Sequence, residues 1–446
     1  MKVSSCTGEN LYLALKQITD AYGLSLADVV GFSSDGAANV SGKHNSAWSR
    51  IKGDAPDAIQ LKCTCHSLQL CIQHAFETLP SSIGALLTDL PNYFRTSTLR
   101  REEYLSLFKL MNDGESPFTN TFTQFCATRW LGRSKVIFNI VTQWWELKAY
   151  FDIAQTQAPM KERYRARELY NMLADRTNLL YFHFLCPLVS EIEAVNKAFQ
   201  SSSPDMSKLL DLLDLQHRSV RSRIFDVNQD KLKEKHLSRV DLGAKFEECA
   251  KDMDKICVDE VRERCKRFLQ KLDSEIEKRI PENKNVLKGV ILFNPDKIVA
   301  TTFADLPFKE FCPDIAEAEN QLRKLKFMTN EDLGFQTPPD DPVVYWAHVK
   351  KHKILDQESF SCLATYALNV LSLPVSNAYV EKVFSLVTFF KDKYSNSMGL
   401  PMLDSLLLLK THLQAIIYIL SIFLIILCNV VSNIISLYIL EKRFNT

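Results

Sequence analysis

The residues that could do chemistry begin with Asp35, in the stretch VVGFSSDGAANVSG at residues 29–42. Val29 to Phe32 reads as a short buried strand, and the acid follows it. The carboxyl end of a buried strand is where α/β enzymes place ligand-binding groups. One carboxylate rarely holds a divalent ion alone, so a metal site would need partners. On residue type alone, a turn or helix-cap role is the more common one for an Asp before Gly.

A second group of candidate ligands lies in KCTCHSLQLC and just beyond it. Its members are Cys63, Cys65, His66, Cys71 and His74. Thiolate and imidazole groups at such spacing could bind zinc. The spacing fits no zinc finger well, and the group spans a strand end and a helix. Packing and local hydrogen bonds are therefore the default expectation.

A third feature is CATRWLGR, in which Arg129 and Trp130 join a guanidinium to a large flat ring. Such a pair can hold a phosphate and stack on a base, although a core Trp with a capping Arg is the commoner arrangement. Nearby arginines extend the set of candidate phosphate contacts: Arg95, Arg100, Arg101 and Arg133.

The fourth feature is SLPVSNAYVEKVFS, near the end of the chain. Asn377, Glu381 and Ser385 recur at i, i+4 and i+8, so they form a polar stripe on a helix whose other positions are apolar. Glu381 is unusual in a helix that packs against a core. A partly exposed stripe explains it equally well.

The elements that must position Asp35 and the cysteines alternate between strand and helix. Hydrophobic spacing predicts helices over 10–22, 37–51 and 68–76, and strands over 28–32 and 59–63. This alternation predicts a parallel sheet. Two strands are too few for a stable sheet, so further strands are expected before the first residue.

The rest of the chain is predicted to be mostly helical. Residues 160–279 show helical spacing, and the charges in 230–237 and 269–280 are interpreted as a solvated helix face. Residues 285–296 read as strand-like or as a short buried segment. Residues 337–342, TPPDDP, form a linker. Helices are predicted over 343–352, 358–371, 378–390 and 401–410, with Ser376 or Asn377 as N-cap of the third.

Composition narrows the function classes only slightly. Lys and Arg number 54 and Asp and Glu 53, so the net charge of +1 indicates no general affinity for nucleic acid, and any binding would rest on local patches. The 12 cysteines are scattered, and MKVSSCTGEN has no apolar run typical of a signal peptide. Free thiols in a reducing compartment are expected.

Taken in order, these pieces resemble one family. SSDGAANVSG, then Cys63-Thr64-Cys65-His66, then TRW, DPVVYW and LPVSNAYVEKVFS are similar to the hAT superfamily of cut-and-paste DNA transposases, in its domesticated, BED-finger-associated vertebrate branch. The resemblance covers about residues 1–412. Its most specific part is the last motif, similar to the family pattern S-x-x-x-x-E-R-x-F-S, with Lys382 in place of the usual Arg.

The resemblance implies an α/β plus all-α fold, in which a truncated RNase H-like domain is interrupted by a large helical insertion. Residues 1–150 would be the partial RNase H-like domain and 151–336 the insertion. Residues 337–413 would complete the RNase H-like domain and carry the dimerisation region. Asp35 matches the second acid of the catalytic triad and Glu381 the third. Cys63 and His66 match the CxxH motif.

Function follows from the same resemblance. Trp130, with Arg129, matches the DNA contact near the cleaved end, and the ancestral chemistry uses two Mg²⁺ held by carboxylates. The family's first Asp lies on a strand before the Asp35 motif, where this sequence has none, and a BED finger is also missing. The expected function is therefore a catalytically inactive, transposase-derived interaction module. The alternative is a working metal-dependent transposase or nuclease.

Partners and location are expectations of the same kind. A second copy or a related hAT-derived protein would bind through residues 337–413, DNA binding would be weak, and the location would be the nucleus. No cofactor is expected for the inactive protein. Mg²⁺, held by Asp35 and Glu381, is expected only if the ancestral activity persists.

The tail at residues 415–440 has no charged residue. A stretch of that length predicts a C-terminal hydrophobic helix that crosses a membrane once, and a buried core helix is the alternative. If this tail is expressed, a membrane location is expected instead of the nucleus.

Overall fold

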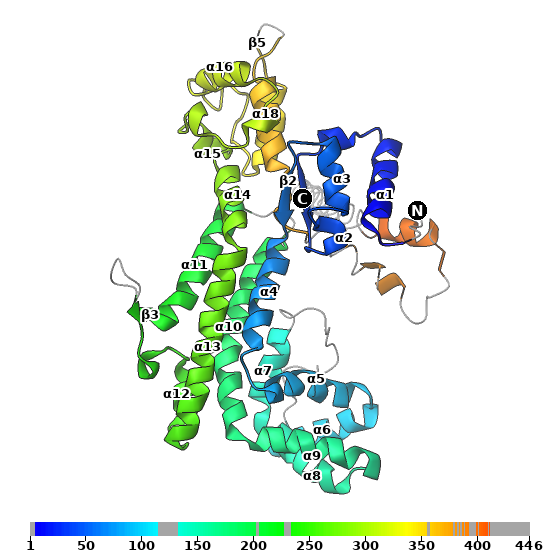
Figure 1. The fold of residues 1–446 in the computed structure, drawn as a ribbon, viewed down its shortest axis with the longest axis vertical. Coiled ribbons are helices and arrows are strands. Elements are labelled where there is room, and N and C mark those ends of the chain that lie inside the picture. The colour runs from blue at the N-terminus through cyan, green and yellow to red at the C-terminus, as the bar shows by residue number, and fades with distance from the viewer. Residues whose placement is uncertain are drawn as a thin grey trace, which may run out of the picture. The chain divides into compact units, whose positions relative to one another are not determined.

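The computed structural model describes most of the chain up to residue 410. The described residues are 5–114, 133–201, 205–226, 233–354, 357–377, 380, 383, 386–387, 389–391, 398–399, 401–408 and 410. The chain divides into two units, residues 1–377 and 378–446, and each is described by itself. Helices dominate the first unit, and its strands are short (Figure 1).

The first unit opens with a small α/β portion. Strand β1 (Gly31–Ser34) pairs in parallel with β2 (Ile59–Lys62), in a register that places Ser34 opposite Lys62. Between them run α2 (Ala38–Ser41) and α3 (Ala47–Asp54), and α1 (Gly8–Ala21) packs on α3. The predicted parallel strand pair is confirmed. The RNase H-like fold as a whole stays a prediction.

Local chemistry shifts two of the predicted elements. The helix predicted over 37–51 is two helices, because Ser46 starts a new one. The Ser46 Oγ accepts from the Ser49 backbone N–H at 3.0 Å, and the Ser49 Oγ accepts from the Ser46 N–H at 3.1 Å. The strand predicted from residue 28 begins at Gly31 instead, because a 3₁₀ turn capped by Ser25 occupies Leu26–Asp28.

Long helices follow β2 and form a bundle. Helices α4 (Thr64–Phe76), α10 (Arg176–Phe199), α11 (Met206–Ile224) and α13 (Lys255–Arg279) pack alongside one another (Figure 1). The other helices of this region are α5 (Ser81–Arg95), α6 (Thr98–Met111), α7 (Ser134–Thr142), α8 (Trp144–Gln157), α9 (Met160–Ala174) and α12 (Ala244–Ala250). Asp175, Asp205 and Asp254 cap α10, α11 and α13 with their carboxylates. The predicted helical character of 160–279 is confirmed for most of the described residues. The helix face expected over 230–237 is wrong in its described part, because Lys233 and Glu234 form a strand that pairs with Phe225 and Asp226.

After the bundle the chain returns to the sheet. Helices α14 (Pro281–Ile291) and α15 (Pro295–Ile298) lead to α16 (Ile315–Leu325), α17 (Pro342–Lys350) and α18 (Ser361–Leu371). The strand-like interpretation of 285–296 is wrong, because Pro281 starts a helix that buries Val286 and Val290 one turn apart. The alternative of a buried segment is right. Short antiparallel ladders pair β3 (Phe225–Asp226) with β4 (Lys233–Glu234) and β5 (Lys353–Ile354) with β6 (Gln357–Glu358).

In the second unit, residues 401–408 are helical, as predicted, and Leu403 is buried. Among the described residues, no helix is both long enough and apolar enough to cross a membrane. The predicted membrane segment, residues 415–440, lies outside the described residues, and the three boundaries between the four predicted segments stay predictions.

Candidate functional site

Asp35 lies where the sequence predicts it, directly after β1. The last strand residue, Ser34, is buried, and Gly36 has a φ of +88°, a conformation that favours glycine. The Asp35 Oδ1 accepts a hydrogen bond from the Ala37 backbone N–H at 3.1 Å. The carboxylate therefore shapes the turn, as the residue-type interpretation expects. The side chain is also exposed, so solvent and ligands can reach it.

Cys63 lies at the same edge of the sheet as Asp35. The two residues directly follow Ser34 and Lys62, which are opposite each other in the parallel ladder. The Cys63 backbone N–H donates to the Ser34 carbonyl at 3.1 Å, which extends the ladder by one bond. Carboxyl ends of adjacent parallel strands are where α/β folds assemble sites.

The buried cysteines of the CxxH segment make packing and hydrogen-bond contacts. Cys63 is 1% exposed and its Sγ accepts from the Asn377 backbone N–H at 3.4 Å. The Cys65 Sγ lies 3.8 Å from the Asn196 carbonyl and 3.6 Å from the Ser376 Oγ. Burial raises the pKa of the Cys71 thiol to about 12, which disfavours the thiolate that a metal would need. His66 lies on α4 and is partly exposed.

Residues 375–377 join the same edge of the sheet. The buried Thr64 hydroxyl donates to the Val375 carbonyl at 3.0 Å, and the Asn283 amide on α14 donates to the Thr64 Oγ1 at 2.9 Å. The same amide donates to the Lys62 carbonyl at 2.7 Å. Three segments far apart in sequence thus meet at the carboxyl end of β2. Glu381 follows four residues after Asn377 and lies outside the described residues.

Two of the candidate phosphate-binding arginines are used inside the fold. Arg100 pairs with Glu162 through two nitrogen atoms and lies 4.3 Å over the Tyr93 ring. Arg133 is 7% exposed, and burial lowers the pKa of its guanidinium to about 10. Arg95 is exposed. The predicted DNA contacts Arg129 and Trp130 lie outside the described residues.

The comparison with known families concerns the C-terminal part of the chain. Residues 318–413 match the model of the hAT family C-terminal dimerisation region. The match confirms the predicted resemblance to hAT transposase-derived proteins. The matched segment begins within α16, includes α17 and α18, and continues into the second unit.

The hAT dimerisation region has large buried aromatic side chains in its core and apolar side chains on its surface. Tyr366 and Trp346 are fully buried, and the Trp346 indole N–H donates to the Phe293 carbonyl at 2.7 Å. Large apolar side chains of the matched segment are nevertheless exposed. In the first unit these are Phe327, Val343, Val344 and Ile354, and in the second Val380, Phe389, Met402 and Leu408.

One cluster of potential metal ligands is not predicted from the sequence. His217 on α11 lies beside Asp273 and Glu277 on α13, and their ligand atoms are mutually close enough to hold a metal ion. The prediction that the charges of 269–280 form a solvated face is wrong for two of them, because Asp273 is only 6% and Glu275 only 5% exposed. The available signal was the i, i+4 spacing of Asp273 and Glu277. A salt-bridged helix surface has the same spacing.

Proposed function

We propose that the chain is a catalytically inactive, hAT transposase-derived protein that works as a dimerising interaction module in the nucleus. The observation that carries the proposal is the family match over residues 318–413. The exposed apolar side chains of that segment support the proposal. Covering apolar surface with a partner contributes about 25 cal/mol of favourable free energy per Å² removed from water. The partner is a second copy of the chain or a related hAT-derived protein.

Light scattering of the protein at several concentrations tests this proposal. We expect self-association at micromolar concentration. The changes Val344→Glu in α17 and Phe389→Glu in the second unit place a charge on an exposed apolar site, 53% and 70% exposed respectively. Each is expected to weaken association by about tenfold or more.

The matched control is Leu110→Glu on α6, because Leu110 is 81% exposed but lies outside the hAT region. This variant should associate like the unchanged protein. A strict monomer at tens of micromolar would contradict the proposal. Equal weakening by the control would show that the apolar surface of the hAT region has no special role.

The second candidate function is metal-dependent cleavage of DNA, favoured by the position of Asp35 at the shared strand end. In the part of the chain that the structure describes, Asp35 belongs to no group of three potential metal ligands. We propose that the ancestral activity is lost, and expect no nicking of duplex or hairpin DNA with Mg²⁺ or Mn²⁺. Nicking that disappears in both Asp35→Asn and Glu381→Gln would instead establish the nuclease.

A further inference from the structure

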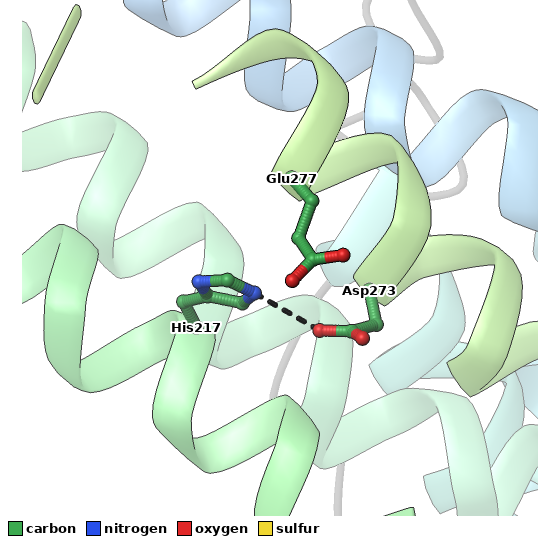
Figure 2. Close-up of side chains that lie close together, drawn as sticks. All are labelled: His217, Asp273 and Glu277. Carbon is green, nitrogen blue, oxygen red and sulfur yellow. Dashed lines mark hydrogen bonds and ion pairs between the residues drawn. The ribbon is translucent and has the colours of Figure 1, made fainter. Parts of the chain in front are cut away.

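The strongest unassigned constellation lies between two long helices of the bundle. Helix α11 contributes His217 and Arg221, one turn apart, and α13 contributes Asp273 and Glu277, also one turn apart. Figure 2 shows the imidazole and the two carboxylates pointing toward one another across the gap between the helices. The site is remote in sequence from both the Asp35 strand end and the hAT region.

The donor atoms form a compact set. The His217 Nε2 and the Asp273 Oδ1 are 2.9 Å apart, and the ligand atoms of all three residues lie within 4.8 Å of one another (Figure 2). The Asp273 side chain is 8% exposed and that of His217 15%, whereas the Glu277 side chain is 49% exposed. The set is therefore rigidly held on one side and open to solvent on the side of Glu277.

Arg221 shares this site but fits it poorly. Its Nη2 donates to the Glu277 Oε1 at 2.5 Å. Its Nε forms an ion pair with the Asp273 Oδ1 at 3.1 Å, in a geometry that makes no hydrogen bond. A buried N–H without a hydrogen bond is costly. Because the Arg221 side chain is 28% exposed, it can turn toward solvent. The guanidinium is thus a positive charge between the two carboxylates that a metal ion can replace.

We propose that His217, Asp273 and Glu277 bind a divalent transition-metal ion, with zinc as the best match. Imidazole suits zinc, and carboxylate oxygens complete zinc sites at bond lengths of about 2.0–2.2 Å. Three protein ligands leave a fourth tetrahedral position for water. The ion replaces the Arg221 guanidinium between the carboxylates and joins α11 to α13.

Calorimetric titration of Zn²⁺ into the full-length, chelator-treated protein tests the proposal. We expect one equivalent of Zn²⁺ to bind the unchanged protein, and His217→Gln and Glu277→Gln to weaken this binding by about tenfold or more. Arg221→Gln should tighten it, because a competing positive charge is removed. Glu277 is the safer second variant, since its side chain is half exposed and its loss should not unfold the bundle.

The matched control is His74→Gln. The His74 Nδ1 lies 3.5 Å from the Glu77 Oε1, an imidazole–carboxylate pair at the end of α4 without a third ligand in the described part of the chain. This variant should bind Zn²⁺ like the unchanged protein. Equal zinc affinity in His217→Gln and the unchanged protein would overturn the proposal and leave the cluster an ion-pair network only. Weaker binding in Arg221→Gln would do the same.

Stability provides a readout that does not depend on stoichiometry. A metal ion that binds only the folded state raises the melting temperature, and the rise grows with the metal concentration. Zn²⁺ should raise the melting temperature of the unchanged protein and of His74→Gln, and should raise that of Glu277→Gln much less at the same zinc concentration. A zinc-dependent rise of the same size in Glu277→Gln would place the bound metal elsewhere and overturn the assignment.

Discussion

Thr64 joins three segments of the chain through a single buried hydroxyl group. Its Oγ1 donates to the Val375 carbonyl and accepts from the Asn283 amide. Thr64→Val keeps the shape but leaves both partners without this bond, which should cost about 1–3 kcal/mol of unfolding free energy. Denaturant titration measures the loss. Thr156→Val, whose exposed hydroxyl bonds only within its own helix, should change stability little, and an equal loss there would contradict this explanation.

Cys71 gives the fold a pH dependence at alkaline pH. Burial raises the pKa of its thiol from 9.0 to about 12, so the folded state prefers the protonated form. The resulting stability is fully present below pH 9 and is lost as the pH rises toward 12. Burial also raises the pKa values of Tyr104 and Tyr150, in the same direction.

Denaturant midpoints at about pH 8 and about pH 10 check this dependence. The midpoint should fall over the interval, and it should fall less in Cys71→Ala, which lacks the thiol but keeps the tyrosines. A fall of the same size in that variant would assign the effect to the tyrosines and to other buried thiols such as Cys265, whose pKa burial also raises.

At the residue scale, the sequence could predict the strand-end positions but not the cluster between the helices. Asp35 and Cys63 each follow a run of residues with strand character, and the parallel pairing brings these ends to one edge. His217 and Asp273 are 56 residues apart, and no local pattern relates them. Their contact depends on how α11 and α13 pack, which is a tertiary property.

At the scale of elements, Asp254 shows how one side chain starts a long helix. Its Oδ2 accepts from the backbone N–H groups of Ile256 and Cys257 at 3.0 and 3.2 Å. Asp254→Ala should therefore cost about 1 kcal/mol of stability, whereas Asp254→Asn should retain most of the cap. Thermal denaturation of the three proteins checks the order. Equal melting temperatures for the Ala and Asn variants would mean that the cap contributes little.

Helix caps and apolar spacing together explain which element boundaries could be predicted from the sequence. Apolar periodicity predicted α1, α4 and the helices of 160–279, because each carries apolar residues at helical spacing. Helix α4 buries one face in the bundle, and α1 packs on α3. The break between α2 and α3 was missed because it depends on the reciprocal bonds of Ser46 and Ser49, which periodicity does not report. The strand-like interpretation of 285–296 failed because a short apolar run, here Val290 to Phe293, does not by itself distinguish a strand from a buried helical segment.

At the scale of the whole molecule, the return of the chain to β2 is the feature that sequence alone could not place. Asn283 reaches Lys62 across 221 residues, and Asn377 reaches Cys63 across 314. The hAT resemblance supplied the expectation that the chain returns after a helical insertion, whereas spacing and composition did not. Asn377 lies in the segment expected to return, whereas Asn283 belongs to the predicted insertion, so the domain bounds stay predictions. The position of Glu381 stays a prediction.

The balance of charge in the whole molecule predicts how it binds DNA. The net charge is +1, and Arg100, one of the candidate contacts, already pairs with a carboxylate within the fold. Few phosphates can then be neutralised, so affinity should be weak. The slope of log affinity against log salt should be about −0.9 per phosphate contacted, with fewer than about four contacts. Fluorescence anisotropy with duplex DNA over a salt series measures this slope. A steep slope for DNA would mean that many charged residues contact phosphates.

Self-association through apolar residues should change little over the same series, because salt screens charges and leaves apolar contacts largely intact. Self-association that salt abolishes would mean that charged residues, not apolar ones, hold the copies together.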